Sequence, residues 1–152
     1  MSDLKKYYLE DFKPGEAFVT ASTTISEDEI LDFARKFDPQ PFHTDPVAAA
    51  NSIYGGLIAS GWHTCSLMMR LLYDNFLRDA GSLGSPGVDE VRWLKPVRGG
   101  DTLTLKAICT DVRASTSKPD RGVSQTLWEV TNQHGELVLT VKGMGMYLRR
   151  PT

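Results

Sequence analysis

The segment between Ser60 and Ala80 constrains the fold more than any other part of the sequence. It contains no proline and, after Gly61, no glycine, so nothing in it interrupts a helix. Its apolar residues do not keep to one face, and Arg70 is its only charged residue up to Tyr73. A helix that is apolar nearly all round is buried rather than laid on a surface. The segment therefore predicts a long helix through the centre of the molecule, wrapped by other elements.

Strands are predicted on both sides of this helix along the chain. Residues 16–24 alternate enough to predict a first strand, which follows a Pro-Gly turn signal. After a glycine-rich break, four more strands are predicted, at residues 88–94, 101–115, 123–131 and 136–148. The last two are joined by a segment with the composition of a hairpin turn. Consecutive strands joined by short turns form an antiparallel sheet, so the predicted fold class is α+β, with a twisted sheet curled around the central helix.

Two shorter helices are predicted before the central one. The first spans residues 26–37, where Ser26 and Glu29 form a capping box at its start. It ends there because two prolines follow and disfavour continuation. The second spans residues 45–50, where Asp45 is placed to cap the first turn and a proline takes the first helical position.

Composition restricts the classes of protein to which the chain can belong. Its length of 152 residues is that of one domain, and we expect a single domain over residues 1–152. The net charge is −2 with no concentrated basic face, so neither nucleic-acid nor membrane binding is expected. Cys65 and Cys109 sit in no metal-binding spacing, and no metal site is expected. The N-terminal residues do not read as a secretory signal, and a cytoplasmic location is expected.

The segment between the two shorter helices carries the residues best suited to chemistry. Asp38 and His43 lie on a stretch stiffened by two prolines, where an acid and an imidazole can converge on one water molecule. Taken alone, the pair is also consistent with structural roles, Asp38 capping local backbone and His43 lying in a loop. Gly61 opens the central helix, whose free N–H groups suit a developing negative charge. Its missing side chain permits either close approach of a ligand or tight packing.

Seven residues carry a resemblance to the MaoC-like dehydratases, a family that includes the (R)-specific enoyl-CoA hydratases. They are Asp38, Gln40, His43, Ile58, Ala59, Ser60 and Gly61. The family motif is an Asp, a polar residue two positions on, a His five positions after the Asp, and then an Ile-Ala-(His or Ser)-Gly helix start. The stretch from Val91 to Leu103 is also similar to the aromatic-x-x-Pro-Val-x-x-Gly-Asp-x-Leu turn common in hot-dog proteins. The resemblance covers about residues 26–105 and implies a hot-dog fold, an antiparallel sheet wrapped round one long helix.

This resemblance implies a hydratase or dehydratase that adds water to, or removes it from, an acyl thioester carried on coenzyme A. Asp38 and His43 are expected to activate the water, and the N–H group of Gly61 to stabilise the enolate oxygen. The apolar neighbours of Asp38 predict a partly buried carboxylate, which burial would make a stronger base. No metal or separate cofactor is implied, and a homodimer is. Contacts with the substrate are expected from Gln40, Ser60 and Trp62.

Two departures from the family pattern bear on the substrate class. Gln40 stands where the hydratases more often have Asn, and Ser60 stands where His often precedes the glycine. Two rival functions stay open, a hot-dog acyl-CoA thioesterase and a non-catalytic module that binds acyl groups. Thioesterases of this fold generally lack the Asp-x-x-x-x-His pattern, and a binding module would be expected to lack the Asp or the His. The candidates for binding the phosphates of coenzyme A are Arg92, Lys95 and Arg98.

Overall fold

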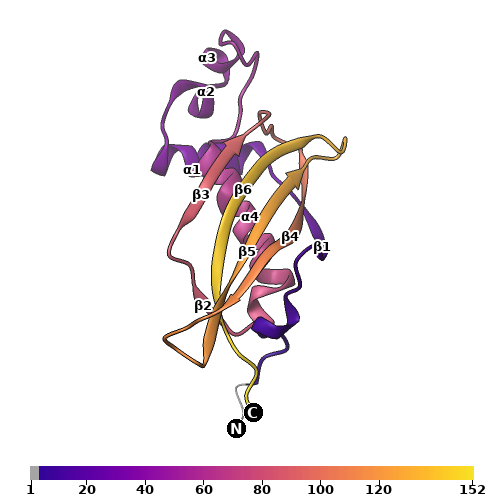
Figure 1. Ribbon diagram of the computed structural model, residues 1–152. Coiled ribbons are helices and arrows are strands. Elements are labelled where there is room, and N and C mark those ends of the chain that lie inside the picture. The colour runs from indigo at the N-terminus through magenta and orange to yellow at the C-terminus, as the bar shows by residue number, and fades with distance from the viewer. Residues whose placement is uncertain (1–3) are drawn as a thin grey trace.

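The computed structural model describes residues 4–152, in which a six-stranded antiparallel sheet wraps around one long helix (Figure 1). The strand order is β1–β4–β5–β6–β2, and β3 pairs with β6 as well. The strands are β1 (Ala17–Thr24), β2 (Ser82–Gly84), β3 (Val88–Trp93), β4 (Thr102–Ala114), β5 (Arg121–Thr131) and β6 (Leu137–Leu148). This arrangement confirms the α+β class and the hot-dog architecture, and five strands fall where the sequence predicts them. The sequence did not predict the short strand β2.

The long helix, α4 (Gly61–Asn75), packs one face against the concave side of the sheet. Because the sheet curls around it, this face lies in the core of the molecule. The core residues of α4 are Met68, Leu71 and Leu72, and those of the sheet include Leu103, Leu105, Val130, Leu139 and Val141.

The prediction that α4 is buried on all sides is wrong for its outer face. Trp62, Met69 and Tyr73 are exposed there, since the sheet covers only one side of the helix. The helix is also shorter than predicted, because it ends at Asn75 and a single 3-10 turn, η2 (Leu77–Asp79), follows. The outer face of α4 is therefore an apolar surface that the described residues leave uncovered.

Three short helices gather at one end of the sheet (Figure 1). They are α1 (Glu27–Phe37), α2 (Pro41–Thr44) and α3 (Pro46–Ala50), and a 3-10 turn, η1 (Leu9–Asp11), precedes β1. The predicted capping box of α1 is present, as Ser26 and Glu29 each bond the backbone N–H of the other. Asp45 caps α3 as predicted. Helix α2 was not predicted, because a single turn that begins at a proline reads as a loop in sequence.

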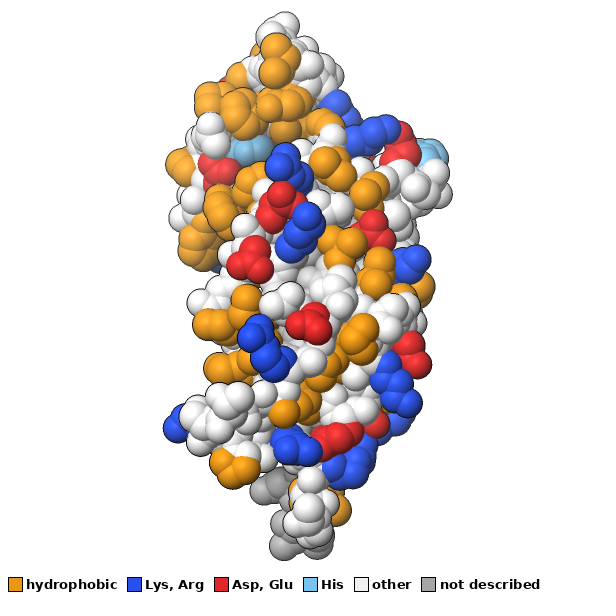
Figure 2. Space-filling view, viewed as in Figure 1, with side chains coloured by type: hydrophobic (Ala, Val, Ile, Leu, Met, Phe, Trp, Pro, Cys, Tyr) orange, Lys and Arg blue, Asp and Glu red, His pale blue; other side chains and the backbone are white. Residues whose placement is uncertain are grey.

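Hydrophobic side chains are prominent on the surface at this end of the molecule (Figure 2). Within residues 4–152, no helix is long and apolar enough to cross a membrane.

The loop from Asn51 to Ser60 connects α3 to α4 and contacts α2, where the Ile58 N–H donates to the Phe42 carbonyl. The neighbouring Ala59 N–H donates to the carbonyl of Val97. These bonds hold the segment before α4 close to α2 and to the loop that follows β3.

Candidate active site

Asp38 lies where α1 ends. Its backbone N–H closes the last turn by donating to the carbonyl of Ala34, and Pro39 then prevents the helix from continuing. The position of its carboxylate is therefore set by the length and direction of α1. The side chain is 17% exposed, so the carboxylate lies at the edge of a pocket rather than deep in the core.

Three side chains surround the carboxylate of Asp38. The Gln40 amide donates to Oδ1 at 2.8 Å, and the Ser60 hydroxyl donates to Oδ2 at 2.7 Å. Nε2 of His43 lies 3.3 Å from the same Oδ2. Burial by itself would raise the pKa of Asp38, but the hydrogen bonds from Gln40 and Ser60 and the charge of His43 together lower it. The expectation that burial makes this carboxylate a stronger base is therefore wrong, because the polar neighbours outweigh the loss of solvent.

His43 lies on α2 with its ring almost fully buried. Its Nδ1 is 2.7 Å from the carbonyl of Ile58, and the edge of the ring contacts Phe42. A carbonyl only accepts, so Nδ1 must carry the hydrogen of this bond. In the neutral ring Nε2 is then an acceptor, and it faces the carboxylate of Asp38. Two acceptors this close can share the hydrogens of one water molecule or a single proton.

The start of α4 lies next to this pair. The side chain of Ser60 is fully buried, so its neighbour is Asp38 and not a molecule in the pocket, contrary to the expected contact with substrate. Gly61 and Trp62 are the first two residues of the helix, and their N–H groups have no acceptor among residues 4–152. These N–H groups lie at the positive end of the helix dipole.

Most of the residues that the sequence predicts for the site line one open pocket of about 510 Å³. Five of the six border it, namely Asp38, Gln40, His43, Gly61 and Trp62. Several lining residues were not assigned from sequence, although Trp93 and Leu94 belong to the second motif noted above. The unassigned ones include Tyr54, Thr64, Trp93, Leu94, Val97 and Val138.

The three candidate phosphate-binding cations are held in different ways. Lys95 borders the pocket and pairs with Glu136. Arg98 donates to the carbonyl of Tyr54 and so supports the loop before α4, while Arg92 pairs with Glu90 on β3. Of the three, only Lys95 lies at the pocket itself.

Comparison with known proteins shows the family to which this chain belongs. Residues 11–131 match the MaoC-like domain. The chain belongs to this family. In this chain, the aspartate and histidine of the motif lie 3.3 Å apart, close to the residue that begins the central helix.

Proteins similar to this MaoC-like chain include dehydratases and hydratases. The crystal structure of a MaoC-like dehydratase from Rhodospirillum rubrum has 37% sequence identity and a TM-score of 0.85, covering 95% of this chain and 99% of its own. An (R)-hydratase from A. caviae involved in PHA biosynthesis has 25% identity and a TM-score of 0.70, covering 93% and 99%. The YdeM protein of Bacillus subtilis (strain 168) is 29% identical over 143 residues, covering 88% and 98%.

Proposed function

We propose that this protein adds water to an α,β-unsaturated acyl thioester, or removes it from the β-hydroxyacyl thioester, with coenzyme A as the carrier. The observation that carries the proposal is the pairing of Asp38 with His43. The bond from Nδ1 to Ile58 leaves Nε2 as an acceptor 3.3 Å from Oδ2 of Asp38. A water molecule that donates one hydrogen to each would have its oxygen lone pair directed into the pocket. Membership of the MaoC-like family supports the same reaction.

The geometry suggests different roles for the two side chains in hydration. An imidazole is intrinsically a stronger base than a carboxylate, and the pKa of Asp38 is lowered by its neighbours. His43 therefore accepts a proton from water through Nε2 while the hydroxyl adds to the β-carbon. The carboxylate of Asp38 orients the water and stabilises the imidazolium. His43 then returns the proton to the α-carbon, so one water is added in all, and dehydration is the reverse.

The start of α4 supplies the electrostatic part of the mechanism. When water adds to the β-carbon, negative charge develops on the thioester oxygen. The free N–H groups of Gly61 and Trp62 suit this oxygen, since they point out of the helix at the positive end of its dipole. One such donor is typically worth about 3–4 kcal/mol in the transition state. The proposed steps require no metal or separate cofactor.

The proposal predicts that Asp38→Asn and His43→Gln each lower kcat/KM by about 10²–10⁴-fold, the usual value of acid–base help. The measurement is the loss of ultraviolet absorbance of the conjugated thioester when purified protein is mixed with crotonyl-CoA. Asp32→Asn on the exposed side of α1 and His134→Gln in an exposed turn are matched controls, expected to retain activity.

Each of the other outcomes has a definite meaning. Equal activity in all variants would contradict the roles given to Asp38 and His43. Release of free thiol without hydration would identify the rival thioesterase. Binding of acyl-CoA without turnover would identify the rival acyl-binding module.

A further inference from the structure

Position 61 requires a glycine because the side chain of Trp93 occupies the space that a Cβ would need. A Cβ built on Gly61 would lie 2.4 Å from Cε2 and 2.5 Å from Nε1 of Trp93, much closer than real side chains approach. The indole of Trp93 therefore lies against the first residue of α4. Because Gly61 has no side chain, Trp93 of β3 can approach its backbone closely. The indole thus lies beside the N–H groups that the proposed mechanism uses.

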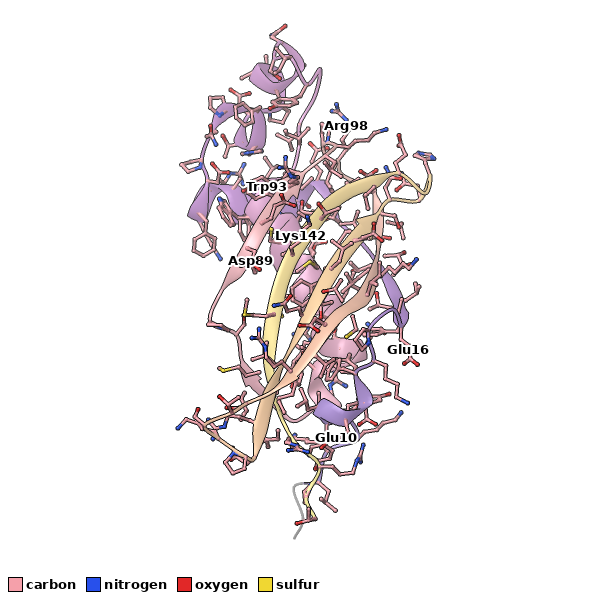
Figure 3. All side chains as sticks on the ribbon, in the orientation of Figure 1. Glu10, Glu16, Asp89, Trp93, Arg98 and Lys142 are labelled. Carbon is pink, nitrogen blue, oxygen red and sulfur yellow. The ribbon has the colours of Figure 1, made fainter. Side chains whose placement is uncertain are left out.

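Trp93 is held in this place from two sides. Its backbone is paired with Leu139 of β6, and the N–H of the next residue donates to the carbonyl of Val138. Its ring meets the edge of Trp62, with the ring centroids 5.1 Å apart and the planes at 79°. Figure 3 shows Trp93 at the end of β3 nearest to the short helices. Trp93 is still 45% exposed, and its side chain forms part of the wall of the open pocket.

Buried side chains form the inner side of the pocket. Its inner wall is made of Thr64, Val97 and Val138, each at most 3% exposed. Behind them, α4 packs directly on the sheet through fully buried side chains such as Leu103 and Leu139. An acyl group bound with its β-carbon at the Asp38–His43 pair therefore extends along the outer side of the pocket, where Trp93 stands.

From this placement we propose that Trp93 is a specificity-determining residue that limits the length of the acyl group. The inference rests on the proposed hydratase function, because it assumes that the thioester oxygen is bound at Gly61. With that oxygen fixed and the inner wall closed, the indole leaves room for a short acyl group and blocks a long one. The preferred substrates are short-chain enoyl thioesters.

The test compares kcat/KM for crotonyl-CoA and octenoyl-CoA in the wild type, Trp93→Ala and Trp93→Phe. Trp93→Ala is expected to raise the ratio of octenoyl to crotonyl activity by about tenfold or more, and Trp93→Phe by less. Tyr73→Ala is the matched control. Its ring is also 45% exposed and lies further along α4, outside the pocket, so this variant should leave the ratio unchanged. A merely structural effect of Trp93 would lower both activities and leave the ratio as it was.

A second measurement needs no activity. Gly61→Ala should lower the free energy of unfolding, since the new Cβ meets the indole, and Trp93→Ala in the same chain should remove most of that loss. Failure of this rescue would overturn the contact on which the proposal stands. An unchanged substrate ratio in a folded, active Trp93→Ala protein would overturn the role of Trp93 and leave the proposed function intact. A wild type that hydrates neither substrate would overturn both.

Discussion

At the scale of single residues, the candidate site depends on how one carboxylate is surrounded. Gln40 and Ser60 donate to different oxygens of Asp38, and His43 faces the second of them. The two positions that depart from the family pattern are therefore both hydrogen-bond donors to the carboxylate that is proposed to orient the water. We infer that Gln40 and Ser60 position Asp38, and that their chemistry sets how readily it takes a proton.

Replacing Ser60 by alanine is expected to raise the pKa of Asp38, because the hydroxyl donates to the charged form and so lowers it. The carboxylate would then be protonated at a higher pH, so the part of the acid limb of kcat/KM that reflects loss of the Asp38 charge is expected to move toward neutral pH. At the pH optimum the loss should be well below the 10²–10⁴-fold expected for Asp38→Asn. Profiles of kcat/KM against pH provide the measurement.

The matched control for this variant is Ser66→Ala. Ser66 is exposed on α4 and donates to a backbone carbonyl of its own helix, away from Asp38. Its pH profile should coincide with that of the wild type. An acid limb that stays in place in Ser60→Ala would show that this hydroxyl does not control the proton affinity of the site.

At the scale of elements, the packing of β5 and β6 depends on matching a large residue on one strand with a small residue on its neighbour. The Trp128 ring of β5 lies over Gly143 of β6, where a Cβ would come within 2.5 Å of the ring. Trp128 is itself buried in the core cluster that also contains Leu71 and Leu72 of α4. The absence of a side chain at Gly143 therefore leaves room for the indole in the core.

Gly143→Ala is expected to lower the free energy of unfolding by about 1–3 kcal/mol, the usual cost of overpacking a core. Urea denaturation followed by far-ultraviolet circular dichroism measures this change. Lys142→Ala, on the exposed face of the same strand, is the control and should change stability by no more than about 0.5 kcal/mol. Equal stability of Gly143→Ala and the wild type would contradict the packing described here.

At the scale of the whole molecule, β3 is an edge strand beside the exposed outer face of α4. It pairs only with β6 among the described residues, so its other side presents free backbone groups to a partner. Acidic and basic side chains mingle on this surface (Figure 2), where Glu90 pairs with Arg92 and Lys142. We propose that two copies join here as a homodimer with continuous sheets.

The charges of β3 select one register for this homodimer. Opposite residues in an antiparallel pair share a face, so Glu90, Val91 or Arg92 could lie on the two-fold axis. An axis at Glu90 or at Arg92 would set like charges opposite each other, which is destabilising. An axis at Val91 sets Glu90 of each copy opposite Arg92 of the other, and this register is therefore favoured.

Sedimentation analysis should find the wild type as a dimer. Glu90→Arg should shift the protein toward monomer by placing two arginines opposite each other, and Glu90→Arg combined with Arg92→Glu should recover the dimer. A monomeric wild type would remove the proposed interface. A dimer insensitive to Glu90→Arg would place the contact on another surface.

The sequence by itself determined most of the helices and strands, and it pointed to Asp38 and His43 as the candidate pair. Capping residues, prolines and apolar periodicity act within a few neighbouring residues, so the helix α1, its end at Asp38 and the existence of α4 could be predicted from local pattern. The family resemblance singled out Asp38 and His43 before any contact was known.

Only the tertiary structure decided what surrounds that pair. The bond from Ser60 to Asp38 joins residues 22 positions apart, and that from His43 to Ile58 joins residues 15 apart. The packing of Trp93 on Gly61 joins a strand to a helix. These contacts lower the pKa of Asp38, set the tautomer of His43 and build the wall of the pocket. No local pattern encodes them, because they depend on how the sheet curls around the helix and brings distant segments together.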